Sequence, residues 1–186
     1  MKKDHNLFAA MGILSSSGNG HIETERKFLI RMPSHDILDM CEGSYIVQTY
    51  ITPEDSEGTT DRIRSRTPIR GGETVFLRTK KKRISELSSY EEDVIISKDE
   101  YDELLKRRIP DMVDIIKKRY LLPFGGLIFE IDIYPFWHDR AIMEVELPKE
   151  DTPFEIPPGI EIIREVTGDS RYKNKSLARS VPYDDI

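Results

Sequence analysis

The chain contains 186 residues, which suits one large domain and allows a sizeable core. Hydrophobic residues make up 38% of the sequence and charged residues 33%, so it has enough apolar material to fold and more charge than most globular proteins. The formal net charge of -6 argues against a protein that binds nucleic acid or anionic membranes, because such proteins present basic surfaces.

The N-terminal twenty residues are expected to form a flexible extension. Residues 7–14 are apolar, but Asp4 and His5 precede them and no convincing cleavage site follows, so a signal peptide is not favoured. The single cysteine, Cys41, excludes an internal disulfide and fits a reducing, cytoplasmic location. No stretch has the roughly eighteen apolar residues that span a bilayer. We therefore expect one domain over residues 21–186, with no membrane partner.

Strand and turn signals alternate through the rest of the chain, with few helices. Short helices are predicted after Ser34, through Met40, and after the capping box Ser97-Lys98-Asp99-Glu100; a last helix is expected over residues 171–180. The residues between them have the β-branched and aromatic content of strands. The predicted strands span residues 23–30, 45–52, 61–66, 74–82, 90–96, 112–122, 127–134 and 141–147.

Charged side chains recur two residues apart on these predicted strands, which is the period of one strand face. Glu23, Glu25 and Lys27 share a face of the first strand. Within residues 80–83, only Lys80 is expected to lie on the strand face that carries the charged row. The other rows are Arg62 with Arg64, Arg78 with Lys80, Glu91 with Asp93, Lys117 with Arg119, Glu130 with Asp132, and Glu144 with Glu146.

The rows opposite the charged ones are apolar, as in Ile131 with Ile133 and Val145 with Leu147. This inverts the usual arrangement and favours a closed barrel with a charged lumen and an apolar outside covered by helices. Carboxylates suit Mg²⁺ or Mn²⁺, and clustered Arg and Lys suit phosphate oxygens. A metal-bound polyphosphate would satisfy both sets. The alternative for any single pair is a cross-strand salt bridge in a structural network.

These residues, in this order, resemble the CYTH superfamily, also called triphosphate tunnel metalloenzymes. The resemblance runs over residues 22–178 and looks closest to the small bacterial inorganic triphosphatases, notably at residues 22–29, 165–167 and 171–175. One departure is Asp93, where the family pattern has glutamate beside the position of Glu91. Aspartate keeps the charge but shortens the reach.

The resemblance implies a mainly β, α+β fold: a closed eight-stranded antiparallel β-barrel with a few covering helices, holding a triphosphate and two Mg²⁺ or Mn²⁺ ions. Lys27 and Glu25 would assist catalysis, and Glu91, Asp93 and Glu130 would hold the basic residues in position. The implied metal ligands are Glu23, Glu25, Asp132, Glu144 and Glu146. The implied phosphate ligands are Lys27, Arg62, Arg64, Lys80, Lys117 and Arg119, with Arg78 and Lys173 as further candidates.

The activity expected from this resemblance is metal-dependent hydrolysis of inorganic tripolyphosphate to diphosphate and phosphate. The alternatives within the superfamily are a thiamine triphosphatase and a class IV adenylate cyclase. A non-catalytic polyphosphate-binding module is the alternative from another class. A small polyanionic substrate is the expected partner, nucleic acid is not, and a homodimer stays open.

Overall fold

The computed structural model describes residues 20–54 and 58–183. The expected N-terminal extension therefore lies outside the described residues, apart from Gly20. The strands of this part of the chain are β1 (His21–Arg31), β2 (Glu42–Ile51), β3 (Thr59–Pro68), β4 (Val75–Arg83), β5 (Ser88–Ile96), β6 (Ile115–Phe124), β7 (Leu127–Ile133), β8 (Arg140–Glu146) and β9 (Ile162–Glu165). Its helices are α2 (His35–Met40), α3 (Lys98–Leu105), the 3-10 helix η1 (Ser170–Tyr172) and α4 (Asn174–Leu177).

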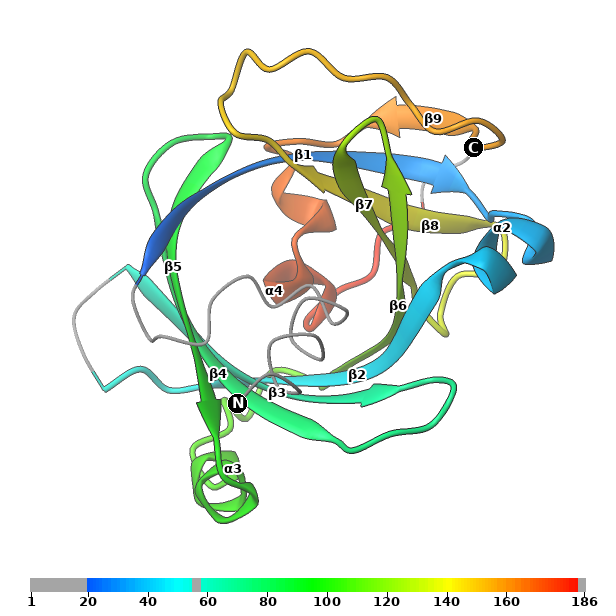
Figure 1. Cartoon of the computed structure of the whole chain (residues 1–186). Helices are drawn as coiled ribbons and strands as arrows, with labels where there is room; N and C mark the ends of the chain where they lie inside the picture. Colours follow the sequence, from blue (N-terminus) through cyan, green and yellow to red (C-terminus); the bar gives the residue numbers. More distant parts are fainter. Residues whose placement is uncertain (1–19, 55–57, 184–186) are drawn as a thin grey trace.

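Strands β1 to β8 form a closed antiparallel barrel, seen along its lumen in Figure 1, so the predicted fold class is confirmed. Closure depends on the long first strand. Residues 21–24 of β1 pair with β5, and residues 25–31 pair with β8, so one strand joins both ends of the sheet. A closed barrel leaves no sheet edge among these eight strands to recruit another chain.

The outer surface of the barrel is apolar, as predicted, but helices cover only part of it. On one side Tyr101 and Leu104 of α3 pack against Ile51 and Ile63. Over β1, β7 and β8 the cover is the segment between β8 and β9, which contributes Phe154 and other apolar side chains. Figure 1 shows this segment and β9 outside the ring. Strand β9 was not predicted, because four residues are too few to establish an alternating pattern.

The short helices begin where the sequence predicts. The hydroxyl oxygens of Ser34 and Ser97 accept hydrogen bonds from the backbone N–H groups of Ile37 and Glu100, at 3.4 and 3.1 Å. The last predicted helix is shorter than expected, because Lys173 has extended backbone angles and separates η1 from α4. No helix in the described ranges has both the length and the apolar character needed to cross a bilayer.

The C-terminal segment packs into one end of the barrel. Tyr172, Leu177 and Ala178 form a single buried core with the inward-facing Leu29 and Ile142. The hydroxyl of Tyr134, a neighbour in that core, donates to Asn174 Oδ1 at 2.7 Å. In Figure 1, α4 accordingly lies within the outline of the ring. The lumen thus has an apolar floor, and the charged rows stand above it.

We expect Phe129→Ala to lower the free energy of unfolding by about 3–5 kcal/mol, because it opens a cavity at a fully buried position under Phe154. The neighbouring Ile128→Ala, at a side chain 46% exposed on the other row, should cost less than about 1 kcal/mol. Urea unfolding followed by circular dichroism measures both. Equal losses in the free energy of unfolding for the two variants would contradict the assignment of Phe129 to the covered outer face of β7.

Candidate active site

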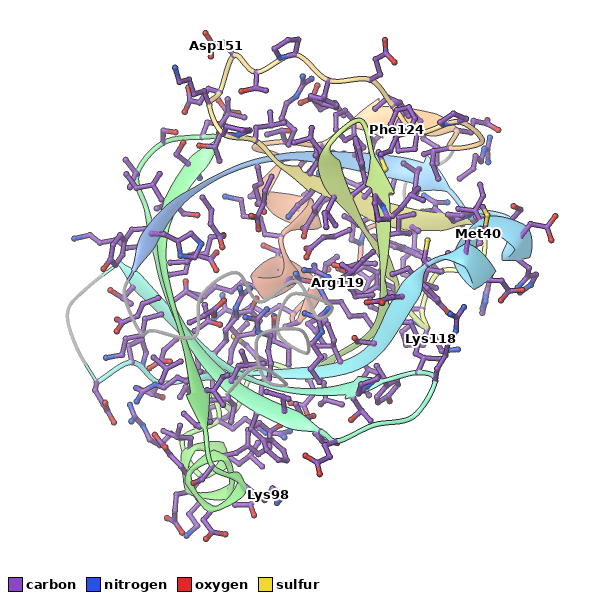
Figure 2. The ribbon with its side chains drawn as sticks, in the orientation of Figure 1. Met40, Lys98, Lys118, Arg119, Phe124 and Asp151 are labelled. Atoms are coloured by element: carbon purple, nitrogen blue, oxygen red, sulfur yellow. The ribbon has the colours of Figure 1, made fainter. Side chains whose placement is uncertain are left out.

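The barrel encloses a cavity of about 280 Å³ whose walls carry the inward charged rows. Figure 2 shows the alternation on β6: Arg119 points into the lumen and Lys118 lies outside the ring. The C-terminal segment adds Lys173 and Lys175 to the lining. The charged strand residues that line the cavity are Glu23, Glu25, Lys27, Arg62, Arg64, Arg66, Lys81, Arg83, Glu91, Asp93, Lys117, Arg119, Glu130, Glu144 and Glu146.

A buried ion network crosses the lumen from β1 to β6. Lys27 Nζ lies 2.7 Å from Glu144 Oε1 and 3.6 Å from Glu25 Oε1. Glu144 also accepts from Arg119 Nη2 at 2.9 Å. Asp132 is fully buried and accepts two hydrogen bonds from Arg119, both at 2.6 Å, and one from Lys117. Asp132 therefore serves as the counter-ion of two cations and does not line the cavity.

The network fixes the charge of its members. Burial alone would lower the pKa of Lys27, but the carboxylates of Glu144 and Glu25 outweigh it and raise that pKa. Lys27 is thus a cation at neutral pH, suited to binding an oxyanion and not to accepting a proton. Burial, followed by the charge of Arg119, lowers the pKa of Lys117 to about 8. The pKa of Glu144 stays well below its ordinary value, because Lys27 and Arg119 overcome the effect of burial.

A second set of ion pairs holds the arginines of β3. Arg62 Nη2 donates to Glu91 Oε2 at 3.1 Å, and Arg64 Nη2 donates to Asp93 Oδ1 at 2.9 Å. The partner of Asp93 is therefore Arg64, and the shorter side chain is supported by a hydrogen bond from Thr79. On the other wall Glu130 accepts from Arg119. Glu91, Asp93 and Glu130 thus contact the basic residues as expected.

The carboxylates of Glu23, Glu25 and Glu146 are paired less closely. Glu25 lies 3.6 Å from Lys27 Nζ, and Glu23 lies 3.8 Å from Lys81 Nζ and 3.0 Å from His21 Nε2. Glu25 and Glu146 stand directly opposite each other on β1 and β8. Among the described residues, Glu146 has no ion pair. Burial and the charge of Glu130 raise the pKa of Glu146 to about 7. Burial and the nearby Glu91 raise the pKa of Glu23 to about 9. Like charges held together in this way favour the arrival of a cation.

The structure corrects the predicted phase of β4. Lys80 and Arg78 are absent from the cavity wall, and Lys81 takes the inward place. The register explains this: Arg62 lies opposite Thr79, and residues directly opposite in antiparallel strands share a face, so Thr79 and Lys81 point inward. Phe76 stacks on Tyr101 of α3 outside the barrel, and Arg78 forms an ion pair with Asp61 at 2.6 Å.

The sequence analysis also missed basic residues that line the cavity. Arg66 continues the spacing of Arg62 and Arg64 along β3, so the same period of two identifies it. Lys175 reaches the site from α4 and donates to Thr60 at 3.3 Å, a contact that no strand pattern reveals. Lys173, predicted as a further phosphate ligand, does line the cavity. Burial and the charge of Arg83 lower its pKa.

Beside Lys27, the C-terminal segment bonds to the edge of β1 that pairs with β5 earlier in the strand. The backbone N–H of Lys27 donates to Thr167 Oγ1 at 2.9 Å, and the backbone N–H of Val166 donates to the Lys27 carbonyl at 2.8 Å. Strand β1 changes partner here, from β5 to β9, so these bonds fill the gap between the two pairings. The Lys27 side chain is therefore positioned from both edges of its strand.

The donor set suits a hard divalent cation. In this conformation no three Asp, Glu, His or Cys side chains of the described residues are grouped closely enough to hold an ion. Glu23, Glu25 and Glu146 nevertheless line one cavity, and Glu146 forms no ion pair with any described residue. Unpaired carboxylate oxygens are the ligands that Mg²⁺ and Mn²⁺ prefer. These residues fit such an ion in the chemistry of their donor atoms.

A closed barrel whose lumen carries rows of arginine and lysine beside rows of carboxylates is the arrangement that the resemblance to the triphosphate tunnel metalloenzymes predicts. Comparisons with known proteins confirm the resemblance. The chain is 40% identical over 70 residues to the inorganic triphosphatase of Acetivibrio thermocellus, an alignment that covers 37% of this chain and 43% of that protein. The match thus spans less than half of the curated relative. No family model matches the chain.

Solved structures support the same resemblance over most of the chain. The inorganic triphosphatase NE1496 is 28% identical, with a TM-score of 0.52, and the match covers 87% of this chain and 97% of that one. The PH1819 protein from Pyrococcus horikoshii OT3 is 17% identical, with a TM-score of 0.50 over 69% of this chain and 80% of that one, and shows the fold alone.

The phase of β4 is testable with neighbouring lysines. We expect Lys81→Ala to raise the KM for tripolyphosphate about tenfold or more, because it removes a cation from the cavity wall. Lys80→Ala should change the KM by less than about threefold. Phosphate-release kinetics on both variants, with circular dichroism to check folding, gives the comparison. A larger effect of Lys80→Ala would restore the phase predicted from the sequence.

Glu23 makes stability depend on pH. The unfolded chain releases its proton near the ordinary pKa of 4.5 and the folded chain near 9, so raising the pH through this window lowers the free energy of unfolding. Glu23→Gln should flatten that decline, measured by urea unfolding from pH 5 to 9 with a chelator present. Glu161→Gln, at an exposed side chain, is the control. Parallel curves for Glu23→Gln and the unsubstituted chain would refute the protonation of Glu23.

Proposed function

We propose that the protein hydrolyses a triphosphate, inorganic tripolyphosphate first among the candidates, to diphosphate and orthophosphate in a divalent-metal-dependent reaction. The observation that carries this proposal is one cavity lined by arginines that acids hold in place and by several carboxylates, of which Glu146 forms no ion pair with any described residue. A linear polyanion accompanied by a cation complements both. The similarity to two proteins named inorganic triphosphatase supports the proposal.

The basic residues of the lumen are arranged to grip phosphate oxygens before the reaction. The guanidinium groups of Arg62, Arg64 and Arg119 are held by Glu91, Asp93 and Asp132, so little side-chain freedom is lost on binding. Guanidinium nitrogens left over from these pairs are available to a ligand. The buried Nε atoms of Arg62 and Arg64 have no hydrogen-bond partner in the part of the chain that the structure describes. Such donors make charge-assisted bonds to phosphate.

Hydrolysis in this site needs positioning and charge stabilisation, and no nucleophilic side chain. The oxygen of a water molecule forms a bond to the terminal phosphorus as the bridging P–O bond breaks, and the water protons pass to the products or to solvent. Lys27 is charged and buried, so it stabilises negative charge that develops on the transferred group. Glu25, 3.6 Å from Lys27 and exposed to the lumen, is the candidate to orient the water.

Glu23, Glu25 and Glu146 would hold the cation, with Glu144 beside them on the inner row of β8. A bound divalent ion would supply neutralisation of phosphate charge and orientation of the attacking water. We leave Asp132 out of this set, because its oxygens are occupied by Lys117 and Arg119. The ion's identity as Mg²⁺ or Mn²⁺, and the number of ions, are parts of the proposal.

Phosphate release from tripolyphosphate, thiamine triphosphate and ATP, with Mg²⁺ or Mn²⁺ and with a chelator, tests the activity. We expect metal-dependent release, fastest from tripolyphosphate. Glu146→Gln should lower kcat/KM about 100-fold and weaken Mn²⁺ binding measured by calorimetry, because it removes a cavity-lining carboxylate that forms no ion pair with any described residue.

Glu161→Gln, outside the barrel, is the matched control for the loss of one carboxylate and should leave both quantities unchanged. Metal-independent release, or release only of diphosphate from ATP, would overturn the triphosphatase assignment. Tight polyphosphate binding without any release would favour the binding module.

A further inference from the structure

Arg66 differs from Arg62, Arg64 and Arg119 in having no acidic partner among the described residues. Its side chain is 5% exposed and lines the cavity. Its Nε and Nη2 atoms are buried and make no hydrogen bond to any residue that the structure describes. A buried guanidinium without a counter-ion is costly to fold, so this donor pair is a strong indication of a ligand.

The acids nearest to Arg66 are already occupied. Glu130 and Asp132 are the carboxylates whose charge reaches it, and both are ion-paired to Arg119; Asp132 also pairs with Lys117. The residues directly opposite Arg66 on the neighbouring strands are Ile46 and Val75, which offer no acceptor side chain. None of the described residues therefore supplies an acceptor for the Nε and Nη2 groups of Arg66. Because Arg66 lines the cavity, a ligand bound there could supply one.

Arg66 also extends the basic row in one direction. Arg62, Arg64 and Arg66 follow one another on the inner face of β3, each about 7 Å beyond the last. Arg62 and Arg64 are tied to the acids of β5, while Arg66 lies beyond those pairs, toward Arg119. An anion held at Arg62 and Arg64 would reach Arg66 by extending along β3 toward Arg119.

We propose that Arg66 forms an additional phosphate subsite, which takes a fourth phosphate group and extends the substrate class from triphosphate to longer linear polyphosphates. This inference rests on the proposed function for the place of the first three phosphates. The Nε and Nη2 donors of Arg66 bind two oxygens of one phosphate, in the paired geometry that guanidinium groups favour. The subsite sets the preference for chain length, while Lys27 and Glu146 serve hydrolysis.

Calorimetric titration of the full chain with sodium tripolyphosphate and with sodium tetrapolyphosphate tests the subsite. The unsubstituted protein should bind tetrapolyphosphate more tightly. Arg66→Gln should lower the affinity for tetrapolyphosphate about tenfold or more and that for tripolyphosphate by less than about threefold. Lys118→Gln removes the same charge from the outside of the barrel and should change neither affinity (Figure 2).

Equal losses for both ligands in Arg66→Gln would overturn the proposal, since Arg66 would then hold part of the triphosphate itself. No loss for either ligand would overturn it as well. If Arg66→Gln does not fold, Arg66→Lys keeps the charge with a single donor centre and should still lose affinity selectively for tetrapolyphosphate; an unselective change would refute the subsite.

The same titration separates this inference from the proposed activity. A protein that binds tetrapolyphosphate selectively through Arg66 but releases no phosphate from any substrate would retain the subsite and lose the triphosphatase assignment. A protein that hydrolyses tripolyphosphate with no dependence of chain-length preference on Arg66 would do the reverse.

Discussion

Charges that point into a barrel must be neutralised there by one another or by a ligand, and this constraint organises the molecule. The buried ion network of Lys27, Glu144, Arg119 and Asp132 meets it on one side of the lumen. Removing one member would leave its partners as uncompensated buried charges, which is costly. The network is therefore both a condition for folding and the means by which Lys27 and Arg119 keep their charge and position.

The remaining charges of the lumen are not balanced in the same way. Glu146 faces other carboxylates, while arginine Nε atoms on β3 lack acceptors. These two deficits are complementary, because a cation neutralises the first and an oxyanion the second. A protein with only structural salt bridges would show neither deficit. The incomplete pairing is the physical argument for a site that takes a metal and a polyphosphate together.

Most of the barrel follows from the sequence, because the period of two on each strand is a local property that needs no tertiary information. The rows of Glu23, Arg62 and Glu144 were identified in this way. Strand β4 shows the limit: Arg78 and Lys80 lie on one row, Lys81 and Arg83 on the other, so both phases look charged. Only the register with Arg62 and Thr79 decides between them. Pairing partners, and the contribution of Lys175 from the C-terminal segment, likewise depend on contacts between distant parts of the chain.

The C-terminal segment that forms the apolar floor also restrains the edge of β1, through the bonds of Val166 and Thr167 to Lys27. Tyr172 and Leu177 place a buried core at that end of the lumen. For the proposed hydrolysis, the substrate and both products would then share the opposite mouth. In that arrangement diphosphate that departs slowly would compete with the next substrate.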